Sequence, residues 1–557
     1  MEQPARIQGA ASSTRWLRLV WCLVAALPVA AAGYWCSLSS VLPESFADRA
    51  ALGEVTPRWD FEQWAAITDE PMHVVARLVH MAALNIPGAT VSSVVWLNLV
   101  CLILLIEAMA SIARKSIGGE GAAQAAARFL LFGLLFASPA WGATWLHGQR
   151  VGVLIAAGIF ASAVRLLGGR QRATPRVAAA VILAAIAPFA HIHGALIGFA
   201  LIPAMLACAR ANNRPRTVAW IGSLLLVTNV AGAVSLRTVP GFGVGEADWL
   251  SALISAPAAT IADLVRAIGA AWLDVFPLFT IDEYVLGATT LLLPALVRWT
   301  GDRSPEALSR CAPWWSCWCF GLLVVLAGAL RYEGIPAVGT LREATYGSCF
   351  VPIGALGVIA VRFGRGLLIV PLGGLLVVAA QDWQRGIETL RLANMRAQRL
   401  QAAVALGDSV PDGGLSRAVR SPDQWQRLRE RGWVPALDDV AVDPLASFGR
   451  ESGGRGHITG GTADVVRGEV RSSLRSAIQR VAVVAFPKNG PPRVIGYARP
   501  DFENAGRSVT WEVQLDAPLA DGTTVRATGY LVDQRAFAPM GGPYVLKDGR
   551  VQTGTGS

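Results

Sequence analysis

Charged side chains are scarce in this sequence. Asp, Glu, Lys and Arg make up 16% of its 557 residues, whereas soluble domains typically carry about 25%. The deficit is confined to about the first 380 residues, and the remainder is polar and charged like a water-soluble domain. Together with a mean hydropathy of +0.44, this excludes an ordinary soluble protein and predicts an integral membrane protein with a soluble C-terminal part.

Cysteine is also used sparingly, and its positions predict no disulfide framework. Most of the eight cysteines fall inside apolar segments, where a thiol behaves as a small hydrophobic group. No cysteine follows Cys349, so the C-terminal part must fold through packing alone. The formal net charge of +10 does not indicate nucleic acid as a partner, because the arginines cluster in loops between apolar segments, as membrane topology requires.

Eleven apolar segments approach the length of about 20 residues that a membrane-spanning helix needs. The three short ones are 177–192, 194–209 and 366–381. We therefore expect an α-helical polytopic membrane protein of about 11 transmembrane helices. The predicted spans are 17–36, 91–113, 127–146, 151–168, 177–192, 194–209, 218–236, 283–300, 313–331, 346–362 and 366–381.

The charges of the loops predict how the chain is oriented in the membrane. Alternate loops are basic, as in Arg114-Lys115 and in the cluster at 165–176, whereas loop 37–90 holds seven acidic residues. The positive-inside rule then places the N-terminus in the cytoplasm, and an odd number of spans places the C-terminal domain outside. The first span also resembles a signal peptide, with small residues at 30–32, but we favour an uncleaved anchor.

The membrane domain is expected over 1–382, with two long outer loops. Loop 37–90 carries a predicted helical run from about 71 to 84, and loop 237–282 carries an amphipathic stretch that ends at Leu273. Such amphipathic segments commonly lie along the membrane interface.

The C-terminal part, 383–557, is predicted to be a small β-rich extracytoplasmic domain. An amphipathic helix is expected over 383–406, followed by a loop-rich stretch that is heavy in Gly and Ser at 449–461. Period-2 alternation and turn signals such as Asp548-Gly549 then predict a β-rich module over about 478–550. Its predicted strands are 480–486, 493–499, 507–515, 523–532 and 543–546.

Carboxylates and histidines gather on the predicted outer face. Asp69 and Glu70 follow the first span, and five of the six histidines lie in outer loops or turns. A carboxylate can take a proton, and imidazoles can steady a departing anion. This placement predicts chemistry on a lipid-borne substrate. An alternative stays open: the pair could cap the helix that begins at Pro71. The outer-face histidines are His73, His80, His147, His191 and His193.

Arg342, in the outer loop before the tenth span, is the main candidate for binding a phosphate, because a guanidinium forks onto phosphate oxygens. Arg331 is a second candidate. His191 and His193 with Asp69 or Glu70 would form only a loose metal site. Inside the spans, Glu107 is the clearest charge, and the scarcity of midplane charge disfavours a transporter.

These features resemble the GT-C superfamily of polytopic glycosyltransferases, and more narrowly a poorly characterised bacterial branch of it. The resemblance covers roughly residues 15–400. It is carried by an acidic pair shortly before Arg-Leu in the first outer loop, a Trp/Gln-bearing turn after the third span, and an Arg/Tyr run before a late span. Members of the branch commonly have His after the Glu, where this chain has Pro71. The matching residues are Asp69, Glu70, His73, Arg77, Leu78, Trp145, His147, Gln149, Arg342 and Tyr346.

The resemblance implies an enzyme of the bacterial inner membrane that moves a sugar from a polyprenyl-phosphate donor to a cell-envelope glycan, lipid or protein. Glu70 or Asp69 would be the general base. Arg342, Tyr346, Arg77, Gln149 and the outer-face histidines would contact substrate. Many such enzymes need no metal, so neither a metal nor a cofactor is expected. Three alternatives remain: a non-catalytic scaffold of envelope assembly, an O-antigen polymerase or ligase, and a flippase.

Overall fold

The structure is a computed structural model, and its helices and strands account for most of the residues that it describes. Those residues are 7–38, 75, 78, 79, 82, 91–118, 121–138, 145, 151–168, 174–210, 214–237, 257–275, 281–300, 304–331, 345–364, 373, 374, 376, 377, 444–449, 456–471, 478–498, 500, 508–515, 517–531 and 536–553.

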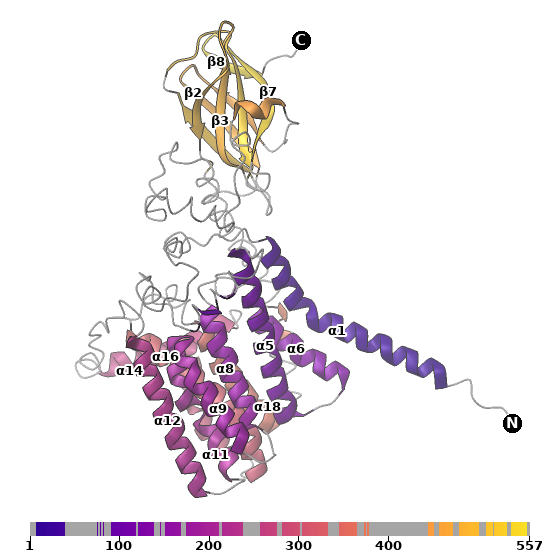
Figure 1. Ribbon diagram of the computed structural model, residues 1–557, viewed down its shortest axis with the longest axis vertical. Coiled ribbons are helices and arrows are strands. Elements are labelled where there is room, and N and C mark those ends of the chain that lie inside the picture. Colours follow the sequence, from indigo (N-terminus) through magenta and orange to yellow (C-terminus); the bar gives the residue numbers. More distant parts are fainter. Residues whose placement is uncertain are drawn as a thin grey trace, which may run out of the picture. The chain divides into compact units, whose positions relative to one another are not determined.

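The chain forms two compact units, one helical and one made of β-strands. The helical unit consists largely of long helices that run alongside one another (Figure 1). Its α-helices are α1 (Ile7–Leu38), α5 (Val91–Ile117), α6 (Ala122–Phe136), α8 (Val151–Leu167), α9 (Thr174–Ile186), α10 (Ile197–Ala200), α11 (Ile202–Arg210), α12 (Arg214–Arg237), α14 (Pro257–Val275), α15 (Glu283–Thr300), α16 (Pro305–Arg331), α17 (Thr345–Ser348) and α18 (Phe350–Phe363).

Within the described parts of the chain, four helices are long and apolar enough to cross a membrane: Trp16–Ser37, Val95–Ile117, Glu306–Ala327 and Tyr346–Phe363. Six shorter apolar helices accompany them, and they coincide with the predicted segments between 127 and 300. Large apolar side chains point outward, including Leu226 and Leu292, which are 66% and 62% exposed. Such a surface suits lipid rather than water. The structure therefore supports a membrane protein, and the count of about eleven spans stays a prediction.

Three of the predicted spans differ from the observed helices. Among the described residues of the span predicted over 127–146, α6 ends at Phe136, and Trp145 is helical again. Ser138 precedes Pro139, and a residue before proline avoids helical backbone angles. The next pair, predicted over 177–192 and 194–209, is interrupted by short 3₁₀ helices, η4 (Ala187–Phe189) and η5 (Ile192–Leu196). The eleventh segment, 366–381, is described only at positions 373, 374, 376 and 377.

Glycines allow the helices to pack closely. α16 and α18 form the most extensive helix pair, and Gly354 and Gly357 of α18 lie against Trp318 and Trp314 of α16. A Cβ atom at Gly357 would overlap the Trp314 ring. Small residues that let helices approach are the usual basis of helix association in membranes.

α14 is the amphipathic helix that was expected along the membrane interface. It packs against α15, and its residues Ile268 and Ala271 share a buried cluster with Val325 of α16 and Val351 of α18. The second half of α14 is therefore covered by protein, whereas Ile261 in its first half is 54% exposed.

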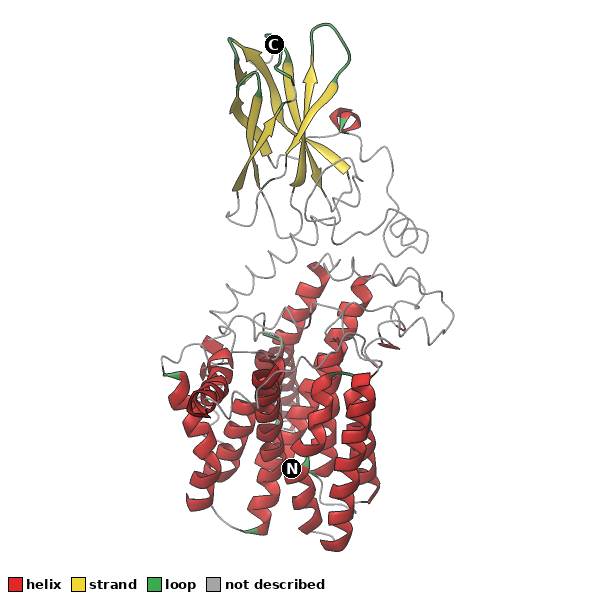
Figure 2. Ribbon diagram, turned by 90° about the vertical axis from the view of Figure 1, so that its left-hand side faces the viewer, coloured by secondary structure: helices red, strands yellow, loops and turns green. Residues whose placement is uncertain are grey.

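The β unit is a sandwich of two antiparallel sheets (Figure 2). One sheet has the order β1-β2-β5, and the other has the order β4-β3-β6-β7-β8. A single buried cluster takes valines and other apolar residues from both sheets, as expected when two sheets pack face to face. The strands are β1 (Gly456–Gly461), β2 (Val465–Arg471), β3 (Ile478–Phe486), β4 (Arg493–Ala498), β5 (Ser508–Gln514), β6 (Thr524–Leu531), β7 (Ala536–Lys547) and β8 (Arg550–Thr553).

Each of the five predicted strands corresponds to one of β3 to β7. The Asp548-Gly549 turn is also confirmed: both residues have positive φ, 51° and 70°, and they join β7 to β8, as a tight hairpin turn requires. Three strands were not predicted. β8 is a short strand beyond that turn, while β1 and β2 fall between 456 and 471, ahead of the predicted start of the module. The module therefore begins earlier than expected.

Candidate functional site

The structure describes three of the ten candidate site residues, namely His191, His193 and Tyr346. The other seven lie outside the described residues: Asp69, Glu70, His73, Arg77, His147, Gln149 and Arg342. The same holds for the predicted helix 383–406 and for His80.

His191 and His193 form a compact pair at the turn between α9 and η5. Their ring centroids are 4.5 Å apart, with the rings inclined at 70°. The backbone N–H of His193 donates to Nδ1 of His191 at 3.3 Å. Because Nδ1 of His191 accepts a hydrogen bond, the neutral ring carries its proton on Nε2. Both side chains are half-buried.

The local sequence explains why the chain turns here. His191 has extended backbone angles, φ −162° and ψ 153°, and so ends the helical path. Gly194 then passes so close to the backbone of Ala187 that a Cβ atom would overlap it, and its N–H donates to the carbonyl of His191 at 2.8 Å. The turn therefore holds the two imidazoles on a closely packed, hydrogen-bonded segment of backbone. Among the described residues, no third potential metal ligand joins the pair.

The side chain of Asn98 on α5 forms a hydrogen bond with the backbone of Trp145. Its Nδ2 donates to the carbonyl of Trp145 at 3.0 Å, and both residues are fully buried. Trp145 Nε1 in turn reaches the carbonyl of Ser138 at 3.4 Å. Sequence reasoning noted Trp145 but missed Asn98, although an amide inside an apolar segment is a signal that it binds a partner.

The segment that precedes α5 also meets the start of α8. Val79 packs against Val151, together with Leu97 and Cys101 of α5. Val75, Leu78, Val79 and Ala82 are helical, which agrees at these positions with the helix predicted over 71–84.

α8 contacts each of the elements that carry a described candidate residue. Besides meeting Val79 through Val151, it packs against η5, which holds the histidine turn, and against α17, which holds Tyr346. α8 and α9 form a helical hairpin, so the end of α9 returns toward the start of α8. The candidate residues that are described therefore lie on elements around one helix.

Tyr346 is buried rather than presented at a surface. Its side chain is 1% exposed, and its ring centroid lies 5.8 Å from that of Phe136. Phe350 lies equally close to Phe136 and belongs to the same aromatic cluster. In this geometry the Tyr346 ring contributes to helix packing, and its contact with substrate stays a prediction.

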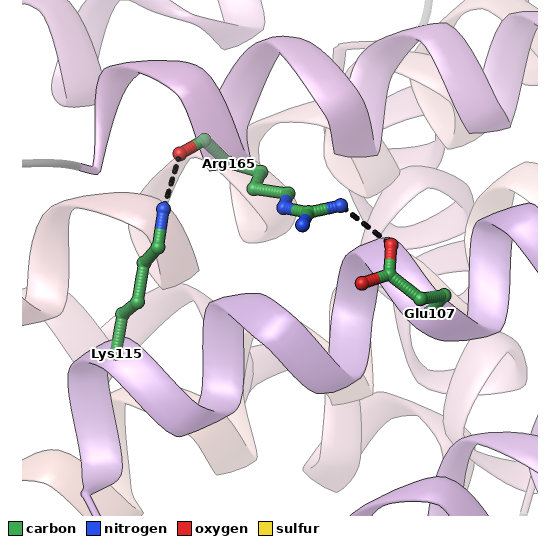
Figure 3. A network of polar contacts seen from close by, with 3 residues as sticks. All are labelled: Glu107, Lys115 and Arg165. Carbon is green, nitrogen blue, oxygen red and sulfur yellow. Dashed lines mark hydrogen bonds and ion pairs between the residues drawn. The ribbon is translucent and has the colours of Figure 1, made fainter.

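A second polar cluster occupies the far ends of α5 and α8 (Figure 3). Arg165 reaches Oε2 of Glu107 at 2.5 Å, and Lys115 Nζ donates to the carbonyl of Arg165 at 3.2 Å. The sequence indicated Glu107 as a charge within an apolar helix but not its partner, which is 58 positions away. A charge inside an apolar segment usually has such a partner.

Comparison of the chain with models of protein families, with curated proteins and with solved structures finds no match.

Proposed function

We propose that this protein is an inner-membrane glycosyltransferase that moves a sugar from a polyprenyl-phosphate donor to a cell-envelope acceptor at the outer face. The observation that carries the proposal is the arrangement around α8, which contacts Val79, η5 and α17. In sequence, Val79 lies two residues after Arg77, and Val151 lies two residues after Gln149. The histidine turn and the element that bears Tyr346 belong to the same neighbourhood.

The chemistry follows from these residue types. Glu70 or Asp69 would take the proton of the acceptor hydroxyl. Arg342 would hold the phosphate of the donor as the glycosidic bond breaks, because a guanidinium binds phosphate oxygens bidentately. A neutral His191, with its proton on Nε2, would donate a hydrogen bond to the departing phosphate oxygen. The apolar exterior of the helical unit would let a lipid-linked donor approach sideways within the bilayer.

The proposed role as a base can be tested apart from helix capping. Asn caps a helix about as well as Asp but cannot take the proton, so Asp69→Asn keeps a helix start and removes a base. Glu70→Gln does the same for the neighbouring position. A deletion strain would be complemented with wild type, Asp69→Asn, Glu70→Gln and Asp69→Ala, and membrane levels would be matched by immunoblot.

We expect the wild type to restore an envelope sugar, and at least one of the two conservative variants to fail while the lipid-linked donor accumulates. If both conservative variants restore the sugar and only Asp69→Ala fails, the pair caps a helix and is not the base. If deletion of the protein changes neither the envelope glycans nor the pool of lipid-linked sugars, the proposal is wrong.

A further inference from the structure

Asn229 places a side-chain amide on the outside of the helical unit. It belongs to α12 and lies within the apolar stretch Ala219–Val234. Its side chain is exposed, and its Nδ2 donates to the carbonyl of Leu225 on the same helix at 2.7 Å. The Oδ1 atom and the second N–H of the amide have no partner within the described part of the chain. A polar group without hydrogen bonds is costly in an apolar environment, so a partner that supplies them is favoured over lipid.

The face of α12 around Asn229 is apolar and open. α12 packs through its other side against α9, α11 and the short helices between them, and Leu224 and Thr228 on that side are fully buried. On the open side, Leu226 and Val230 are 66% and 54% exposed. α12 lies at one side of the bundle (Figure 1). A second helix could therefore reach Asn229 without displacing any part of the bundle.

The exposed residues in line with Asn229 have the spacing of a helix–helix seam. The intervals between them alternate between three and four residues, as do the a and d positions of left-handed helix pairs, the prevailing arrangement of helices in membranes. A Cβ atom at Gly222 would meet no heavy atom within 4 Å, so there is room for close approach. The seam consists of Ala219, Gly222, Leu226, Asn229 and Ala233, all of them exposed.

A second copy of the chain is the occupant whose chemistry fits this seam. Loop charges give every copy the same orientation in the membrane, so a two-fold axis between two copies runs along the membrane normal and their α12 helices are parallel. In a parallel pair, each seam position faces the same position of the other helix. An amide is complementary to itself, because it donates through its N–H groups and accepts through its oxygen. A lipid acyl chain offers neither group.

We propose that α12 forms a symmetric contact between two copies of this chain, in which Asn229 hydrogen-bonds to the partner's Asn229. The seam residues on either side pack against the other helix, and the amide pair fixes the register of the two helices, as a single polar seam residue does in coiled coils. This contact does not depend on the glycosyl transfer proposed above.

The test measures dimerisation of the full-length protein in phosphatidylcholine vesicles. Energy transfer between two fluorophores on the C-terminal end is followed as the lipid-to-protein ratio is raised. A hydrogen bond between membrane helices changes their association by about threefold to thirtyfold. Asn229→Leu, which nearly conserves the side-chain volume, is expected to weaken dimerisation by this factor, whereas Asn229→Gln keeps the amide and should retain most of it. Size-exclusion profiles confirm that each variant folds.

Thr289→Val is the matched control. Thr289 is an exposed polar residue of the apolar helix α15, and its hydroxyl already donates to the carbonyl of Val285 at 2.6 Å. Its removal should therefore leave dimerisation unchanged. If Thr289→Val weakens dimerisation as much as Asn229→Leu, or if neither variant weakens it, the role of Asn229 is refuted.

Cysteine crosslinking tests the geometry of the seam, in a Cys22→Ser background because Cys22 is exposed. Copper phenanthroline should oxidise the two thiols of a Leu226→Cys dimer to an intermolecular disulfide. Val227→Cys should crosslink much less, since position 227 is turned about 100° around the helix from position 226. Equal crosslinking at both positions would overturn the proposal, and so would a wild type that stays monomeric at low lipid-to-protein ratio.

Discussion

Replacing Gly357 by alanine should destabilise the helical unit, although alanine is the better helix former. A Cβ atom at this position would overlap the Trp314 ring across the α16–α18 contact. Trp314 is 2% exposed, and its Nε1 donates to Oγ of Ser116 on α5 at 2.8 Å. The indole therefore cannot turn aside without giving up a hydrogen bond to a third helix.

The loss of stability in Gly357→Ala can be estimated from these contacts. Adding a methyl group to a well-packed core costs about 1–3 kcal/mol, and losing the Trp314–Ser116 hydrogen bond costs roughly another 0.5–1.5 kcal/mol. The gain in helix propensity returns about 1 kcal/mol. We expect a net loss of about 2 kcal/mol, and a melting temperature that falls by roughly 4–8 °C on the scaling for domains of 150–250 residues. The assay heats the detergent-solubilised full chain and follows the remaining monodisperse protein by size exclusion.

Gly158 of α8 and Gly222 of α12 provide matched controls. Both are helical, and a Cβ atom added at either would meet no heavy atom within 4 Å. Gly158→Ala and Gly222→Ala should therefore leave the melting temperature unchanged or raise it by a few degrees, since only the gain in helix propensity applies. If Gly357→Ala melts at the same temperature as these controls, the close approach of α16 and α18 is not as described.

Three further predictions concern other contacts. Asn98→Leu removes the donor to the buried carbonyl of Trp145 and should cost about 1–3 kcal/mol in the same melting assay; an unchanged melting temperature would contradict the role of Asn98. Gly549→Val places a β-branched residue at φ 70° and should destabilise the β unit by at least about 1–2 kcal/mol, whereas Gly542→Ala, at a position with open space, should not. Burial raises the pKa of Tyr544 above its usual value near 10, so its stabilising effect is present below that pH and is lost as the pH rises through the folded-state pKa. Tyr544→Phe should reduce this alkaline loss in denaturant titrations of the β unit, and an identical pH profile would exclude the effect.

Much of the helical unit could be predicted from local sequence. Long apolar runs predict helices because only a helix satisfies its backbone hydrogen bonds within one segment in lipid. Each predicted span overlaps an α-helix, apart from 366–381, of which only four residues are described. Period-2 alternation and turn signals identified β3 to β7, because alternating apolar and polar side chains are typical of a strand that buries one face. The carboxylate pair Asp69-Glu70 was also visible from sequence, but its geometry falls outside the described residues.

The strands β1 and β2 could not be read from local sequence because their glycines resemble a loop. Gly468 of β2 pairs with Trp511 of β5, and a side chain at 468 would overlap the indole ring. The glycine is therefore required by a residue 43 positions away. A strand interior accepts glycine when another group must approach closely, and that requirement appears only once the sheets are paired.

The sequence by itself determined the class of this protein: apolar helices for a membrane followed by a β-rich unit, because hydropathy and periodicity are local properties of the chain. Only the tertiary structure decided which polar groups meet. Arg165 pairs with Glu107 and Trp314 with Ser116, across 58 and 198 positions. Such pairings depend on how whole helices pack, and packing is set by shape complementarity between distant segments.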